Sequence, residues 1–140
     1  MYILDTNVIS ELRKTNSGRA HPAVVRWSNT VAPTDLFLSA VAIFELEMGL
    51  LKIADRTDDQ YRRLRAWFAD QVLVTFSGKI LPIDENVALI FARIMTPKTR
   101  PYRDALIAAT AEHHGYAVVT RNVRDFTELP VRVINPWDFT

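Results

Sequence analysis

Short apolar segments alternate with longer amphipathic segments along this chain, and this alternation limits the folds that it can adopt. The apolar segments have the length and composition of buried strands, and they lie at residues 1–4, 36–38, 80–83, 117–120 and 131–134. Strands that are separated by helices pair in parallel, and a parallel sheet needs helices on both faces. We therefore predict an α/β fold with a central parallel β-sheet.

The segments between the strands carry apolar residues at helical spacing, and several begin or end at residues that favour helix termini. Ser39 and Asp84 can cap the helices that follow them, and Gly115 can end a helix. One helix is expected to begin at residue 22, and four others are expected at residues 40–53, 58–76, 85–95 and 101–114.

The length and composition indicate one ordinary folded domain, residues 1–140. The chain has 140 residues, of which 49% are hydrophobic, and it contains no repeat and no low-complexity stretch. No apolar run approaches the roughly 18 residues of a membrane span, and the first residues do not resemble a signal sequence. We expect a cytoplasmic protein.

The absence of cysteine restricts the kind of metal site that the chain can form. With no cysteine and three histidines, a bound metal ion would be held by oxygen atoms or by imidazole, and oxygen ligands favour a hard cation. The net charge of +1 neither indicates nor excludes nucleic-acid binding, because the distribution of the charges matters more than their sum.

Four acidic residues lie where a parallel sheet would bring them together. Asp5 ends the first strand, Glu45 lies in the helix after the second, and Asp125 follows the strand that ends at Thr120. Asp104 lies in the first turn of a helix, where the helix dipole favours a negative charge. Since sites in such folds form at the carboxyl ends of the strands, we expect these side chains to meet there.

Each carboxylate also has a purely structural interpretation. Asp5 could be a helix cap, Asp104 a first-turn charge and Asp125 a turn residue, whereas Glu45 stands among apolar neighbours, where an unpaired carboxylate is costly. Clustered carboxylates repel one another unless a cation neutralises them, and Mg²⁺ or Mn²⁺ prefers oxygen ligands. Such ions activate water for the hydrolysis of phosphodiester bonds. The acidic set therefore favours a metal-dependent hydrolase.

Four segments, at residues 3–12, 39–49, 103–111 and 119–126, resemble in order the successive motifs of PIN-domain toxins of the VapC and FitB-like group. The resemblance implies a PIN-like α/β/α sandwich and an Mg²⁺- or Mn²⁺-dependent endoribonuclease, the toxin of a type II toxin–antitoxin system. It also implies a homodimer, a cognate antitoxin and a heterotetramer or larger complex with it. Asp5 and Asp104 match the principal metal-binding aspartates, and Glu45 matches the acidic residue of the second motif.

The fourth acidic position of the family differs here. Many relatives have an acidic residue where this chain has Asn122, and Asp125 is the nearest carboxylate, so it can substitute, act through water or play no part. Thr6 and Thr120 match hydroxyls that orient the carboxylates or the attacking water, and we place Asn122 in the same supporting group.

The expected partners are RNA and the antitoxin. Lys98, Arg103 and Arg121 are candidates for contact with RNA phosphates. A basic segment of the antitoxin is expected to reach the carboxylates with an arginine. The apolar groove that holds this segment would be formed by the two helices at residues 40–76, with candidates Phe44, Met48, Tyr61, Leu64 and Trp67.

Two other functions remain open. An aspartate after a strand can be a phosphoacceptor, but such a domain uses a lysine near its last strands, where this chain has Arg121 and no lysine after Lys98. The second alternative is a non-catalytic RNA-binding or assembly module on the same fold, which the Asn122 difference keeps open.

Overall fold

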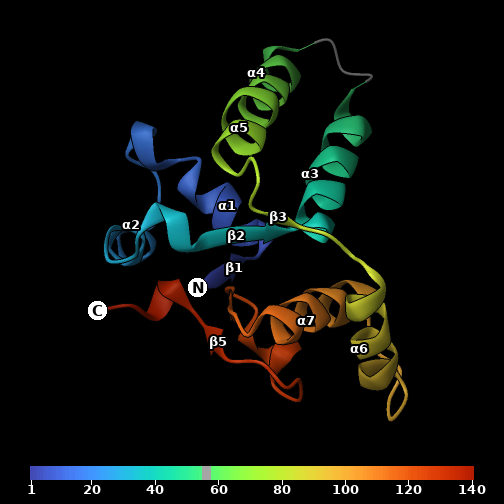
Figure 1. The fold of residues 1–140 in the computed structure, drawn as a ribbon. Coiled ribbons are helices and arrows are strands. Elements are labelled where there is room, and N and C mark those ends of the chain that lie inside the picture. Colours follow the sequence, from blue (N-terminus) through green and yellow to red (C-terminus); the bar gives the residue numbers. More distant parts are fainter. Residues whose placement is uncertain (55–57) are drawn as a thin grey trace.

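Five parallel strands form one sheet at the centre of the computed structural model, which describes residues 1–54 and 58–140. The strand order is β3-β2-β1-β4-β5, and each neighbouring pair is parallel, as the sequence predicted. The strands are β1 (Tyr2–Leu4), β2 (Leu36–Ser39), β3 (Ile80–Leu81), β4 (Ala117–Val119) and β5 (Val133–Ile134). Because β1 is central, its carboxyl end is surrounded by the ends of β2 and β4 (Figure 1).

Helices cover both faces of the sheet, so the predicted α/β/α layering is confirmed (Figure 1). One face carries α1 (Thr6–Leu12), α2 (Pro22–Asn29), α3 (Ala40–Ile53), α4 (Asp59–Trp67) and α5 (Leu73–Thr75). The other face carries α6 (Glu85–Met95) and α7 (Tyr102–His114). A π-helical turn at Phe68–Val72 joins α4 to α5, so the single helix expected at residues 58–76 is interrupted.

The core follows directly from the alternation of side chains along buried strands. Ile3 and Val118 pack into the cluster under α6 and α7, whereas Leu4 and Val119, the next residue in each strand, pack into the cluster under α1 to α4. Both faces of β1 and β4 are therefore apolar, which explains why these strands appear as continuous apolar runs in the sequence.

The residues at the carboxyl ends of β1 and β2 also cap the helices that follow. Asp5 caps α1 and Ser39 caps α3, so each of these helices begins at once where its strand ends. The backbone N–H of Asp5 donates to the carbonyl oxygen of Val119 at 2.8 Å, which fixes the end of β1 beside β4. The capping expected of Ser39 and Asp84 is confirmed, because each side chain accepts a backbone N–H of the following helix.

Two strands, β3 and β5, are each two residues shorter than predicted. β3 ends at Leu81 because Pro82 has no N–H to donate to a neighbouring strand. β5 begins at Val133, two residues late, because the N–H of Val131 donates to Leu129 in a local turn instead of to the sheet. In the described part of the chain, no helix combines the length and apolarity that crossing a bilayer requires.

Candidate active site

Asp5 lies at the end of the central strand and is completely buried. One carboxylate oxygen accepts the backbone N–H of Thr6 at 2.7 Å and a guanidinium N–H of Arg103. The other accepts the hydroxyl of Thr120 at 2.7 Å and, more weakly, the amide of Asn7 at 3.4 Å. A buried carboxylate is tolerated only when its oxygens are hydrogen-bonded or paired with a cation, and Asp5 has both kinds of partner.

The Thr120 hydroxyl holds the β4 side of the site. It donates to Asp5 and accepts the Asn7 amide at 3.3 Å and the backbone N–H of Asn122 at 3.0 Å, so its hydrogen-bonding capacity is filled. Asn7, whose carbonyl oxygen also accepts the backbone N–H of Arg121, links the start of α1 to the end of β4. Sequence reasoning did not assign Asn7 to the site, although it stands two residues after Asp5.

Glu45 and Asp104 approach the same point from two other helices. Glu45 lies on α3, and its carboxylate accepts the Thr6 hydroxyl at 2.7 Å. Asp104 lies in the first turn of α7, with its side chain only 11% exposed. The structure thus brings Asp5, Glu45 and Asp104 together as the sequence predicted, and it places Thr6 and Thr120 on these carboxylates.

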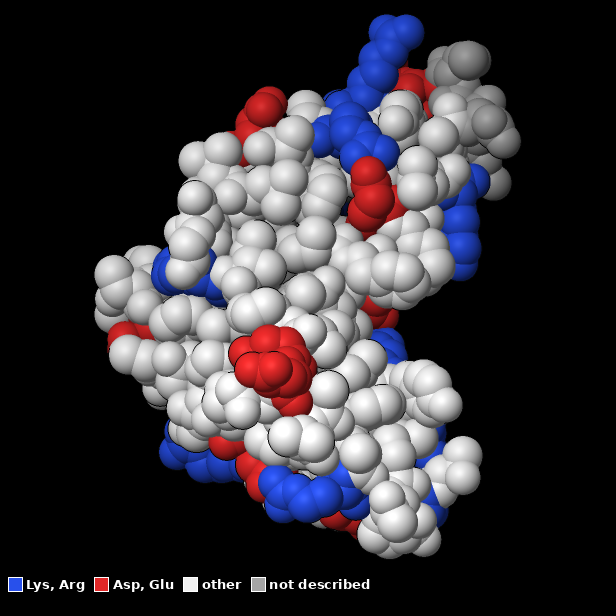
Figure 2. All heavy atoms as spheres, turned by 45° about the vertical axis from the view of Figure 1, so that its right-hand side comes forward, with Lys and Arg blue, Asp and Glu red and all other residues white. Residues whose placement is uncertain are grey.

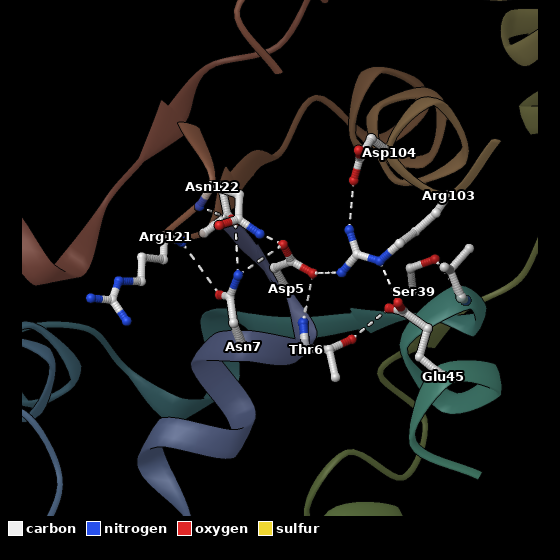
Figure 3. A network of polar contacts seen from close by, with 11 residues as sticks. Asp5, Thr6, Asn7, Ser39, Glu45, Arg103, Asp104, Arg121 and Asn122 are labelled. Carbon is white, nitrogen blue, oxygen red and sulfur yellow. Dashed lines mark hydrogen bonds and ion pairs between the residues drawn. The ribbon is translucent and has the colours of Figure 1, made fainter. Parts of the chain in front are cut away.

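The guanidinium of Arg103 lies between the three carboxylates (Figure 3). Its Nε donates to Glu45, one terminal nitrogen donates to Asp5, and the other donates to Asp104 at 2.5 Å. We call this group of four residues the carboxylate–arginine cluster. Arg103 was expected to contact RNA, but in the structure three carboxylates of its own chain occupy its guanidinium.

The charges of the cluster shift two pKa values. Burial by itself would lower the pKa of the Arg103 guanidinium, but the hydrogen bond to Glu45 and the charge of Asp5 raise it above its usual range. Burial raises the pKa of the Asp104 carboxyl, although Arg103 opposes this effect. One guanidinium against three carboxylates leaves an excess of two negative charges in a confined volume.

The donor atoms of this set of residues suit a divalent metal ion. The donors are all oxygen atoms, they come from three carboxylates that converge on one cation, and the charge excess is two; these features suit Mg²⁺ or Mn²⁺. Within residues 1–54 and 58–140, however, no three acidic or histidine side chains already stand close enough to hold one ion. The oxygen donors suit the metal ion, but in this structure the Arg103 guanidinium lies where the ion would bind.

The fourth acidic position lies at the margin of the cluster. Asp125 is exposed, contributes to the raised pKa of Asp104 and lines the same hollow of about 450 Å³. Asn122 contributes its backbone N–H to Thr120. Asp125 is thus near enough to act on Asp104 electrostatically, and Asn122 supports the cluster through its backbone.

The other two candidates for RNA contact, Lys98 and Arg121, are exposed. Lys98 pairs with Glu128 at 3.0 Å, and both side chains are exposed. Arg121 points away from the carboxylates, and its guanidinium lies over the ring of Trp137 at 5.2 Å (Figure 3). Both cations are therefore accessible, and neither is part of the carboxylate–arginine cluster.

Comparison with known proteins identifies the family. The PIN domain family matches residues 2–131 of the chain. Toxin FitB of Neisseria gonorrhoeae is 39% identical over 98% of this chain and 99% of its own length. VapC ribonuclease Y4jK of Sinorhizobium fredii is 35% identical over 99% of each chain.

Solved structures agree with this result. The crystal structure of FitAcB from Neisseria gonorrhoeae matches with a TM-score of 0.86 and 35% identity over 99% of this chain and 100% of that one. A toxin–antitoxin complex from Klebsiella pneumoniae matches with a TM-score of 0.67 and 26% identity over 97% of this chain and 98% of that one. The chain therefore belongs to the PIN-domain family, in the group that contains FitB and VapC, as its four motifs indicated.

The contacts of Asp5 and Asp104 predict different costs of substitution. Asp5→Asn should lower the free energy of unfolding by about 1–3 kcal/mol, because an amide group would face donors at a fully buried site. Asp104→Asn should change it by less than about 1 kcal/mol, because burial already favours a neutral side chain there. The measurement is urea unfolding at pH 7 in EDTA.

Asp125→Asn is the control for this comparison, because it makes the same chemical change at an exposed position. It should leave the free energy of unfolding unchanged. Equal losses in the Asp5 and Asp104 variants would contradict the burial argument. If repulsion between the carboxylates dominated, both variants would be at least as stable as the wild type. We do not expect this for Asp5, because the Arg103 guanidinium already neutralises its charge.

Proposed function

We propose that this protein is a metal-dependent endoribonuclease and the toxin of a type II toxin–antitoxin system. The observation that carries the proposal is the convergence of Asp5, Glu45 and Asp104, from three separate elements, on one cationic centre. The names of two full-length relatives, a toxin and a VapC ribonuclease, support both parts of the proposal.

The three carboxylates would hold the metal ion. Bound Mg²⁺ or Mn²⁺ supplies a water of lowered pKa and offsets charge on the phosphodiester. Thr120 and the backbone of Thr6 hold Asp5 in one orientation, and the Thr6 hydroxyl holds Glu45. Asp104 would supply the third carboxylate, from the first turn of α7.

RNA would lie across the carboxyl ends of the strands. Lys98, which lines the same hollow as Asp104, and Arg121 are both exposed, so both can contact phosphates. Arg121 is held over Trp137, which limits the freedom that its side chain would lose on binding. Asp125, at the margin of the site, would assist through its effect on Asp104.

The phosphoacceptor alternative has little support from the geometry. Such a domain uses one dominant aspartate and a lysine, whereas here three carboxylates meet and the cation beside Asp5 is Arg103. The non-catalytic alternative differs from the proposal in one measurable respect, because it predicts RNA binding without new RNA ends.

Two different faces of α3 suit the two protein partners. The groove expected between the helices at residues 40–76 is divided: Leu64 and Trp67 line a hollow of about 310 Å³ that also contains Glu45 and Gly49. Phe44 and Met48 line a separate hollow, between α3 and α7. The first hollow has polar and apolar lining residues and suits an antitoxin segment. The second is almost wholly apolar and suits a second copy of the chain.

The first prediction from this function concerns cleavage. Glu45→Gln should lower the rate of RNA cleavage in Mg²⁺ by about 100-fold or more, because Glu45 is both a proposed metal ligand and the acceptor of the Thr6 hydroxyl. Glu47→Gln, the same change two residues away, should keep the rate within about two-fold, since Glu47 pairs with Arg65 outside the site. The assay is incubation with total RNA and sequencing of the new ends.

EDTA provides the second arm of that assay. Cleavage by the wild-type chain should stop in EDTA and return with added Mg²⁺. Equal rates in the Glu45 and Glu47 variants, or cleavage that persists in EDTA, would contradict the proposed site. RNA binding without new ends in Mg²⁺ would favour the non-catalytic alternative.

The second prediction concerns the antitoxin. A Cβ at Gly49 would meet no atom within 4 Å apart from its chain neighbours and the backbone of its own helix, so Gly49→Met should keep α3 intact and fill the hollow between α3 and α4. It should weaken binding of the protein encoded beside this chain by about ten-fold or more. Gly49→Ala is the control, because it adds only the Cβ and should retain binding. Undiminished co-purification with the methionine variant would exclude this hollow as the antitoxin site.

A further inference from the structure

Arg103 makes an unusual set of contacts for a single side chain. Each of its three guanidinium nitrogens donates to a different carboxylate, and those carboxylates are the residues that the proposed function assigns to the metal. A planar guanidinium presents donors along its edges, so it can bind several carboxylates at once. The side chain thus performs the charge neutralisation for which the metal is required.

The metal ion and the guanidinium cannot occupy this position together. The oxygens that Arg103 engages belong to all three proposed ligands, and no described set of three acidic or histidine side chains is close enough to bind one ion while it is there. Two cations at contact distance would also repel each other. Metal binding therefore requires the guanidinium to leave.

The surroundings of Arg103 give it a route out. Its side chain is 30% exposed, whereas Asp5 is fully buried, so the arginine is the partner that already reaches solvent. It borders the hollow between α3 and α7, which has a volume of about 590 Å³ and is lined otherwise by apolar side chains and Glu45. Figure 2 shows a hollow with largely uncharged walls between the upper and lower parts of the molecule. Rotation of the side chain about its own bonds would bring the guanidinium to solvent there without unfolding α7.

We propose that Arg103 is a built-in placeholder for the metal ion, and that its release and metal binding are two halves of one exchange. This inference rests on the proposed function, since it concerns the same carboxylates. In the metal-free chain Arg103 offsets the repulsion between them and keeps the site formed. In the metal-bound chain it lies outside the cluster, and the affinity for the metal is lowered by the stability of the contacts that have to be broken.

The test compares Mn²⁺ binding by calorimetry in three full-length proteins without RNA: wild type, Arg103→Gln and Arg124→Gln. Arg103→Gln should bind Mn²⁺ more tightly than the wild type by about ten-fold, or about 1.4 kcal/mol, because no cation has to be displaced. Arg124→Gln removes the same charge beside Asp104, in a residue with no ion pair to the cluster in the described chain, and should leave the affinity unchanged.

A second measurement uses the wild-type chain alone and does not depend on the folding of a variant. The Nε–H signal of Arg103 in a nitrogen-15 NMR spectrum, assigned through the backbone signals of the same residue, should exchange slowly with water in EDTA. Saturating Mg²⁺ should remove that protection. A signal that stays protected at saturating Mg²⁺ would overturn the proposal.

The possible results separate this inference from the proposed function. Equal Mn²⁺ affinities in wild type and Arg103→Gln, together with Mg²⁺-dependent cleavage by the wild type, would overturn the placeholder role and leave the nuclease assignment in place. Equal gains in the Arg103 and Arg124 variants would reduce the effect to general electrostatics and overturn it too. Absence of Mn²⁺ binding in every variant would overturn both.

Discussion

A carboxylate without access to solvent, at the end of the central strand, is the constraint on which the site depends. Burying a carboxylate is costly unless other groups compensate, and each group that compensates Asp5 comes from a different element. The start of α1 supplies the backbone N–H of Thr6, the end of β4 supplies the hydroxyl of Thr120, and α7 supplies Arg103. The same contacts that satisfy Asp5 therefore hold the strand ends and helix starts together at the site.

The alternation of short apolar runs and helices was sufficient to predict the parallel sheet, because runs such as Leu36–Ser39 are buried on both faces. The meeting of Asp5, Glu45 and Asp104 was predictable too, from strand ends and helix starts. The role of Arg103 was not, since a long side chain can point along several directions, and only the placement of α7 beside β1 and α3 selects one. Local sequence also gave no signal for the π-helical turn at Phe68–Val72.

The helix α3 joins the chemistry of the site to its protein surfaces. Glu45 is part of the carboxylate–arginine cluster, and it also lines two hollows, one between α3 and α4 and the other between α3 and α7. The sequence pattern indicated apolar faces on α3 and α4. It could not show that Phe44 and Trp67 line separate hollows, because helical spacing shows which residues share a face but not which elements that face contacts. A partner on either face would thus lie within reach of a residue of the site.

The proposed activity and the exchange at Arg103 both require the three carboxylates to hold a metal ion in place of the guanidinium. The most direct measurement is a crystal structure of the chain grown with Mn²⁺, with the ion located by its anomalous scattering. The account predicts one or more Mn²⁺ peaks against Asp5 and Asp104, with Arg103 turned out of the cluster. Saturating Mn²⁺ with no peak at these carboxylates, or with Arg103 still bound to all three, would contradict it.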